Sequence, residues 1–144
     1  MEVQQYMTKD VKTCTENDSV AFATKKMAEF NIGSIIVVKN EKPVGIFTER
    51  DLVRRVIALD KNSAEMLIGD VMTKKLITVD AKESIGVAYH IFIERNVRHA
   101  PVVKDEKLLG IVSQKDLAKV LDSQFYATYL GEDKYGKKDL SGEY

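Results

Sequence analysis

One heptapeptide pattern occurs twice in this chain, as Gly45-Ile46-Phe47-Thr48-Glu49-Arg50-Asp51 and as Gly110-Ile111-Val112-Ser113-Gln114-Lys115-Asp116. Each copy places a glycine and two apolar residues before a hydroxyl residue, and an aspartate follows three positions after the hydroxyl. A hydroxyl with an acid three positions later is the acidic form of a capping box, which marks a helix N-terminus. The pattern therefore predicts, in both places, a strand that ends where a helix begins.

The two copies belong to a longer internal duplication. When the chain is shifted by 65 positions, residues 7–52 align with residues 72–117 without a gap, and 17 of the 46 positions are identical. Most of the other positions pair one apolar residue with another. A repeat of this length indicates two structural units of the same kind.

Both units have the same order of predicted elements. An extended piece, 11–15 or 76–79, precedes a helix that starts at Ser19 or Ser84, residues suited to a helix N-terminus. Two apolar runs follow, 34–39 with 44–47 and 99–104 with 108–112, each pair joined by a polar turn as in a β-hairpin. A second helix begins after Thr48 or Ser113. The sequence thus predicts β-α-β-β-α twice, an α/β (α+β) fold.

One such unit of about 50 residues buries too little apolar surface to be comfortably stable alone. We therefore expect the copies to cover each other's sheet face as a pseudo-two-fold pair with one shared core and with clefts where they meet. The expected division is 7–60, 68–123, and a helical extension with a polar tail over 124–144. The aromatic residues of that extension pack against the chain's own body or against a second subunit.

The composition argues against several classes of protein. Lys and Arg number 22 and so do Asp and Glu, so the net basic field of a general nucleic-acid binder is missing. One cysteine and two histidines are too few for a common zinc site, and Cys14 aligns with a strand residue, which indicates a core position. No segment resembles a membrane span or a signal peptide, so we expect a cytoplasmic protein without membrane contact.

Catalytic motifs are also missing from the sequence. It contains no nucleophile–base set, no P-loop and no metal-ligand cluster. The two aspartate motifs are related by the repeat, which fits two binding sites better than an acid–base pair. We therefore expect no enzymatic activity and no cofactor.

The duplicated unit resembles the CBS (cystathionine β-synthase-type) domain. The resemblance covers about residues 7–122 and rests on the two heptapeptides, on Met72-Thr73 and on the segment Asn96-Val97-Arg98-His99-Ala100-Pro101-Val102-Val103. It implies a stand-alone CBS pair, a regulatory module that in this family commonly forms a homodimer. Its output would then pass through a change of oligomer or through an effector protein that the sequence does not identify.

The resemblance also implies ligand sites in crossed clefts, where the aspartate motif of one copy faces the strands of the other. In the family the aspartate accepts hydrogen bonds from ribose hydroxyls, and the expected ligands are AMP, ADP or ATP, with S-adenosylmethionine as a further candidate. The first cleft would be formed by Thr48, Arg50, Asp51, Leu76, Ile77, Arg98 and His99. The second would be formed by Ser113, Lys115, Asp116, Val11, Lys12, Gly33 and Ser34.

The two expected clefts are not equivalent. Arg98 and His99 of the first have Gly33 and Ser34 as their counterparts in the second, and arginine offers bidentate contacts to phosphate that these residues cannot make. The first cleft should therefore bind nucleotides more tightly, although Lys12 and Lys115 would partly compensate in the second.

Two other interpretations stay open at this point. The hydroxyl and aspartate residues of both motifs can act as helix caps alone, without any ligand. Alternatively, the chain is a nucleic-acid-binding or scaffold protein that uses a basic patch, formed by Lys25, Lys26, Arg54 and Arg55.

Overall fold

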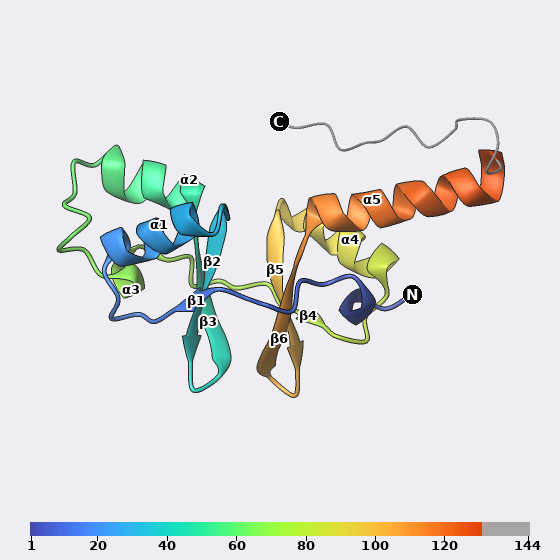
Figure 1. Ribbon diagram of the computed structural model, residues 1–144, viewed down its shortest axis with the longest axis horizontal. Coiled ribbons are helices and arrows are strands. Elements are labelled where there is room, and N and C mark those ends of the chain that lie inside the picture. Colours follow the sequence, from blue (N-terminus) through green and yellow to red (C-terminus); the bar gives the residue numbers. More distant parts are fainter. Residues whose placement is uncertain (131–144) are drawn as a thin grey trace.

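The computed structural model describes residues 1–130, apart from the side chain of Leu130, and contains two α+β repeats side by side (Figure 1). The first repeat contains β1 (Thr13–Cys14), α1 (Val20–Glu29), β2 (Ser34–Lys39), β3 (Lys42–Thr48) and α2 (Glu49–Asp51), which continues as a π-helical segment (Leu52–Ile57). The second contains β4 (Val79–Asp80), α4 (Ile85–Arg95), β5 (His99–Lys104), β6 (Lys107–Ser113) and α5 (Gln114–Phe125), which continues as a π-helical segment (Tyr126–Leu130). The predicted order is confirmed, and most of the expected tail lies outside the described residues.

The two sheets have the same topology and register. In the first, β1 runs parallel to β2, and β2 runs antiparallel to β3; β4, β5 and β6 repeat this arrangement. Ser34 pairs with Thr48 in one sheet, and His99 pairs with Ser113 in the other. This repetition confirms the pseudo-two-fold pair, and it brings the first residue of each second strand next to the hydroxyl that starts each second helix.

The hairpin turns follow from backbone conformation. Asn40 and Glu41 have φ of 51° and 65°, and Asp105 and Glu106 have the same values. Two consecutive residues with positive φ are typical of the two-residue turn whose twist matches the flanking strands. The tips also contact each other, because Lys42 lies 2.9 Å from the Glu106 carboxylate and Lys107 lies 3.4 Å from the Glu41 carboxylate.

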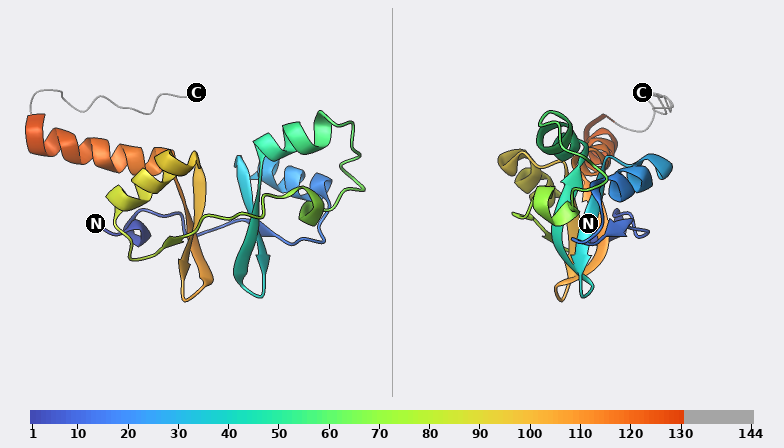
Figure 2. Two further views of the ribbon diagram at one scale, coloured as in Figure 1. Left: turned by 180° about the vertical axis from the view of Figure 1, so that it is seen from behind. Right: turned by 90° about the vertical axis from the view of Figure 1, so that its left-hand side faces the viewer.

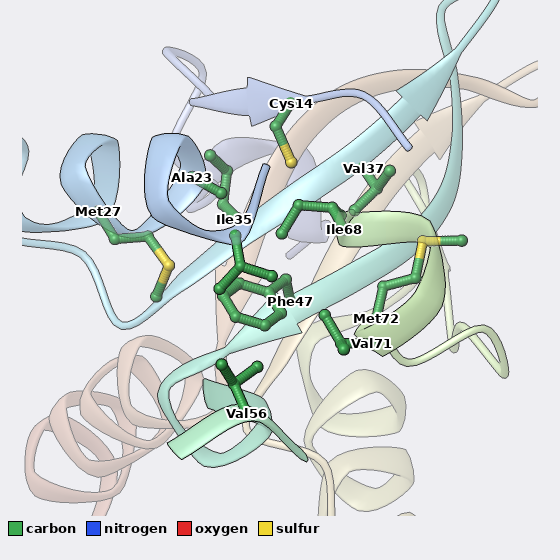
Figure 3. Close-up of a cluster of buried hydrophobic side chains, with 11 residues drawn as sticks. Cys14, Ala23, Met27, Ile35, Val37, Phe47, Val56, Ile68, Val71 and Met72 are labelled. Carbon is green, nitrogen blue, oxygen red and sulfur yellow. The ribbon is translucent and has the colours of Figure 1, made fainter. Parts of the chain in front are cut away.

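The hydrophobic core is divided into two clusters, one in each repeat. In the first, Ile35 and Phe47 from the sheet pack against Met27 and Ala23 of α1 and against Val56 (Figure 3). The second cluster has Phe92 of α4 and Val102 of β5 in the corresponding places. The prediction of one shared core is therefore wrong. Strand alternation explains the division, since one face of each sheet meets its own helices and only the other face meets the neighbouring sheet.

Each cluster is completed by a segment from outside its own repeat. A short 3₁₀ turn (Val3–Gln5) lies on the second repeat, where the Val3 N–H donates to the Glu83 carbonyl over 2.8 Å. The short helix α3 (Ile68–Val71) lies on the first repeat, where the Ile68 N–H donates to the Asp18 carbonyl over 2.9 Å. Figure 2 shows both connecting segments crossing between the repeats. The sequence did not predict these two elements.

The crossing segments also extend the sheets. Thr8 forms an antiparallel bridge with Ile111 of β6, and Thr73 forms one with Ile46 of β3. The two N–H···O bonds of each bridge measure 2.8 and 3.0 Å. Each repeat thus holds the strand-like segment that leads into the other, which positions the loops after Thr8 and Thr73 against the neighbouring repeat.

Candidate ligand-binding clefts

Both aspartate motifs lie where a strand ends and a helix begins. Thr48 and Ser113 have extended backbones and cap the following helices: the Asp51 N–H donates to the Thr48 hydroxyl over 3.2 Å, and the Asp116 N–H donates to the Ser113 hydroxyl over 3.0 Å. The predicted capping role is confirmed for both hydroxyls. It brings both aspartate side chains to the boundary between the repeats.

The Asp51 carboxylate is buried, with 5% of the residue exposed, and it has several donors. The Thr48 N–H donates to Oδ2 over 3.0 Å, which completes the capping box. The Thr73 hydroxyl lies 3.2 Å from Oδ1 and 3.3 Å from Oδ2, and the Arg55 Nε lies 3.6 Å from Oδ1. Asp51 therefore links the helix start to the segment that enters the second repeat.

The Asp116 carboxylate has a different environment. Among residues 1–130, no side chain or backbone N–H donates a hydrogen bond to it, and no capping box forms. Val120 occupies the position that corresponds to Arg55, so the helix offers no guanidinium there. Asp116 thus keeps its acceptor capacity free, although the residue is half-buried.

The first cleft, which we call the Asp51 cleft, has a volume of about 340 Å³. It contains every residue that the sequence assigned to it, namely Thr48, Arg50, Asp51, Leu76, Ile77, Arg98 and His99. Leu76 and Ile77 reach it from the loop before β4, not from the strand that the sequence predicted there. The two repeats therefore form this cleft together, in the crossed arrangement that the resemblance implied.

The second cleft, which we call the Asp116 cleft, has a volume of about 270 Å³. Of the residues assigned to it, six line the cavity, namely Val11, Lys12, Gly33, Ser34, Ser113 and Asp116. Lys115 is not among its lining residues within the described part of the chain. Its counterpart Arg50 does line the Asp51 cleft, so the two clefts also differ at this position.

The charged residues that line the clefts differ more than the sequence predicted. The Asp51 cleft has three cationic side chains, Arg50, Lys75 and Arg98, and two carboxylates. Among the described residues that line the Asp116 cleft, Lys12 is the one lysine or arginine, against Asp10 and Asp116. The Lys12 ammonium is itself held by Asp10 at 3.0 Å and lies 4.2 Å from the centre of the Phe30 ring.

Lys75 and Asp10 were missed at the sequence level. They are counterparts under the 65-residue shift and carry opposite charges, a signal that the alignment of the repeats contained. Each enters its cleft through the segment that crosses between repeats. The bridges at Thr8 and Thr73 hold these segments against the neighbouring repeat, and this contact brings Asp10 and Lys75 into the clefts.

His99 and Gly33 line both clefts, so they mark the place where the clefts approach each other. Burial lowers the pKa of His99 below the ordinary value of 6.5; the Arg98 charge also lowers it, while Asp116 and Glu49 oppose the shift. The imidazole is therefore neutral at pH 7 in this structure. Its contribution to either cleft at that pH is hydrogen bonding and packing instead of a positive charge.

The proposed basic patch is only partly available for nucleic acid. The Arg55 guanidinium donates to the carbonyl oxygens of Val71 and Met72 over 3.1 and 3.0 Å, and Lys26 donates to the Thr13 carbonyl over 2.7 Å. Two of its four cations are thus held by backbone acceptors. Lys25 and Arg54 complete the patch.

Two further observations concern the described part of the chain. Within residues 1–130, no helix is long and apolar enough to cross a lipid bilayer. In the same range, no three His, Cys, Asp or Glu side chains gather as a metal site would require.

Helix α5 projects beyond the second repeat (Figure 1), and Phe125 and Tyr129 near its end are 54% and 72% exposed. These two rings pack on each other, with centroids 5.0 Å apart.

Comparison with known proteins identifies the family. The family model described as the CBS domain matches residues 3–58 and 68–123, and the chain belongs to this family. An uncharacterised protein of Methanopyrus kandleri is 34% identical over 142 residues, which cover 97% of this chain and 72% of that protein. A solved structure of a protein with CBS domains from Burkholderia ambifaria is 32% identical with a TM-score of 0.79, and the match covers 85% of this chain and 95% of that one.

Two further solved structures carry information on ligands and assembly. The CBS domain pair of the protein MJ0100 is 26% identical with a TM-score of 0.76, over 86% of this chain and 98% of that one, and contains 5′-methylthioadenosine and S-adenosyl-L-methionine. The CBS-CP12 protein from bloom-forming cyanobacteria is 30% identical with a TM-score of 0.78, over 90% of this chain and 75% of that one, and is hexameric.

Proposed function

We propose that this CBS pair is a regulatory module that binds a phosphorylated adenosine, AMP, ADP or ATP, in the Asp51 cleft. The observation that carries the proposal is the crossed cleft itself, in which Thr48 and Asp51 of one repeat face Leu76, Ile77 and Arg98 of the other. Its volume of about 340 Å³ lies within the range of small-molecule sites, about 300–1,000 Å³. The adenosyl ligands of the MJ0100 pair support the choice of an adenosine compound.

The proposed roles follow from the chemistry of the lining residues. Leu76 and Ile77 offer an apolar surface for the base, and the Asp51 carboxylate offers acceptors for ribose hydroxyls. Arg98 and Lys75 supply positive charge for the phosphates, and arginine adds the bidentate geometry that phosphate favours. Because Asp51 already accepts from Thr48 and Thr73, a ribose would share or replace the Thr73 contact.

The proposal is for binding without catalysis. Thr48 and Asp51 are repeated as Ser113 and Asp116, and each hydroxyl is engaged as a helix cap, where it accepts an N–H. A pair of duplicated caps resembles two binding positions more than one reaction centre. Chromatography of ATP after prolonged incubation with the pure protein tests this part, and formation of ADP or AMP in proportion to protein would contradict it.

We further propose that ligand binding changes how the chain associates with itself as a homodimer or with an effector protein. The exposed rings of Phe125 at the end of α5 and of Tyr129 in the π-helical segment that continues it support a contact with another chain. The hexameric CBS-CP12 protein is a relative that assembles. Light scattering after size exclusion, with and without ATP, tests for a dimer and for its response; a monomer under both conditions would leave only the effector route.

Calorimetric titration with AMP, ADP, ATP and S-adenosylmethionine up to about 1 mM tests the binding proposal. Arg98→Ala removes a guanidinium whose charge-assisted hydrogen bonds to phosphate contribute about 1.5–3 kcal/mol, so affinity for AMP should fall at least about tenfold. Arg95→Ala is the matched control, because Arg95 is also exposed but lies outside both clefts. If no nucleotide binds to the folded wild type, Thr48 and Asp51 serve as a helix cap alone.

A further inference from the structure

The Asp116 cleft contains a carboxylate that the fold leaves without a donor. In the part of the chain that the structure describes, Asp51 accepts hydrogen bonds from Thr48 and Thr73 and is in an ion pair with Arg55, whereas the Asp116 carboxylate accepts a hydrogen bond from none. The two oxygens of a carboxylate together accept several hydrogen bonds. The unused acceptors of Asp116, beside the hydroxyls of Ser113 and Ser34, suit a ligand that brings its own hydroxyl donors.

The same cleft has no free positive charge for a phosphate. Lys12, its only lysine or arginine among the described lining residues, is in an ion pair with Asp10 at 3.0 Å. Gly33 stands where the other repeat has Arg98, and Asp10 stands where it has Lys75. A phosphate in this cleft would lie near two carboxylates and one neutralised lysine, which is unfavourable electrostatically.

Two remaining sources of positive potential do not change this balance. The N-terminus of α5 points toward the cleft, but Asp116 in its first turn already faces that end of the helix dipole. His99 also lines the cleft, and its lowered pKa keeps it neutral at pH 7. The electrostatic environment thus disfavours anions while the hydrogen-bonding groups favour a diol.

We propose, on the basis of the function proposed for the Asp51 cleft, that the Asp116 cleft binds an adenosyl compound without phosphate, so that the two clefts divide ligands by charge. Asp116 accepts the ribose hydroxyls in this arrangement, and Asp10 rejects a 5′-phosphate. The chain would then report on two ligands at once: a phosphorylated adenosine in one cleft and an uncharged nucleoside or thionucleoside in the other.

The test uses adenosine and 5′-methylthioadenosine as the uncharged probes and AMP as the charged probe, in calorimetric titrations of the full chain. Wild type should bind one uncharged probe per chain, and saturation with AMP should change that affinity less than about twofold. Asp116→Asn should weaken the uncharged probe at least about tenfold, because it removes the charged acceptor, while Arg98→Ala should leave its affinity unchanged. Absence of probe binding, or displacement of the probe by AMP from the Asp116 cleft, would overturn the proposal.

A second test gives one repeat the charge that the other repeat carries at the corresponding position. It changes only exposed residues. Asp10→Lys places a cation at the position of Lys75 and releases Lys12; both positions 10 and 75 are exposed, so folding should be preserved. This variant should gain a second AMP site, or bind AMP there about three- to tenfold more tightly than wild type. An unchanged AMP stoichiometry and affinity would count against rejection by Asp10.

These outcomes separate the two proposals. If wild type binds no AMP but binds adenosine in a manner that depends on Asp116, the function proposed for the Asp51 cleft fails and the assignment of the Asp116 cleft stands. If AMP binds with dependence on Arg98 and no uncharged probe binds, the reverse holds. Lys75→Asp is the reciprocal control, and it should weaken AMP in the Asp51 cleft without changing the adenosine affinity.

Discussion

At the scale of single residues, Asp51 is a structural group as well as a candidate ligand contact. Its carboxylate satisfies the Thr48 N–H and the Thr73 hydroxyl at a site that is almost fully buried. Asp51→Ala should therefore lower the free energy of unfolding by about 2 kcal/mol, because a cap is lost and buried donors are left unpaired. Asp116→Ala removes a carboxylate without such partners and should cost less than about 1 kcal/mol.

Urea unfolding followed by circular dichroism measures both values, and the repeat itself provides the matched control. Equal losses for the two alanine variants would show that the extra hydrogen bonds of Asp51 contribute nothing to stability. The difference also matters for ligand titrations, since a loss of binding in Asp51→Ala has meaning only at temperatures where that variant remains folded.

His99 makes stability dependent on pH, with a sign that the structure determines. Burial lowers its folded-state pKa below the 6.5 of an unperturbed histidine, with Arg98 acting in the same direction against Asp116 and Glu49. The unfolded chain therefore takes up the proton first as the pH falls. The resulting loss of stability begins near pH 6.5 and levels off below the folded-state pKa.

Urea midpoints for wild type and His99→Gln at pH 7.5 and 5.5 measure this effect. Wild type should lose more stability than His99→Gln between the two pH values, because the glutamine does not titrate. A larger loss in His99→Gln would mean that Asp116 and Glu49 stabilise the protonated imidazole and raise the pKa of His99 instead of leaving it lowered by burial.

At the scale of elements, two glycines allow the crossing segments to reach the sheets. A Cβ on Gly110 would lie 2.5 Å from the Met7 sulfur and 2.8 Å from the Thr8 carbonyl oxygen. A Cβ on Gly45 would lie 2.6 Å from the Met72 sulfur and 3.1 Å from the Thr73 carbonyl oxygen. The recurrence of methionine and glycine in both copies thus reflects one contact made twice across the repeats.

Alanine at either glycine should destabilise the chain by about 1–3 kcal/mol, and Gly110→Ala should cost more because a backbone oxygen cannot move as a methionine side chain can. Gly86→Ala is the control, because a Cβ added at Gly86 would have nothing within 4 Å. Alanine at this position inside helix α4 should stabilise the chain by about 0.5–1 kcal/mol. Thermal unfolding measures all three. A stabilised Gly110→Ala would mean that the Thr8 segment does not pack tightly on β6.

Capping residues and apolar runs predicted the helices and strands that such short sequence patterns determine. Helix starts at Ser19 and Ser84 and the strands Ser34–Lys39 and His99–Lys104 follow from capping residues and apolar runs. Helix α3 and the turn at Val3–Gln5 are too short for apolar residues to recur at helical spacing. They form because α3 completes the core of the first repeat and the turn completes the core of the second. Tertiary contacts, not propensity, decide such segments.

The same limit applies to the clefts. The sequence assigned thirteen residues that do line them and one, Lys115, that does not. It missed Lys75 and Asp10, and it missed the Thr73 and Arg55 partners of Asp51. Lys75, Asp10 and Thr73 depend on where a segment from one repeat lies against the other, which no pattern within a single repeat records, whereas Arg55 is an i,i+4 neighbour of Asp51 whose helical spacing the sequence did contain.

At the scale of the whole molecule, the crossing segments should make the two repeats unfold together. Val3 belongs to the second hydrophobic cluster although it precedes the first repeat, and Val71 belongs to the first cluster although it precedes the second. Each core therefore includes a segment that crosses the boundary between the repeats, and we expect unfolding of one repeat to weaken the core of the other. Loss of the second cluster therefore also detaches the Thr8 segment that leads directly into β1.

Cys14 reports on this coupling from within the first cluster. Its thiol is 4% exposed, and burial, more than the nearby Asp18 charge, raises its pKa to about 12, so a thiol reagent at pH 7.5 should react only after unfolding. Val3→Ala in the second cluster should cost about 2 kcal/mol. If the repeats unfold together, this change speeds Cys14 labelling about 30-fold, whereas Val87→Ala, at an exposed position of the second repeat, leaves it unchanged. Unchanged labelling in Val3→Ala would mean that the first repeat opens by itself, and a ligand in either cleft would then stabilise both repeats only by bridging them.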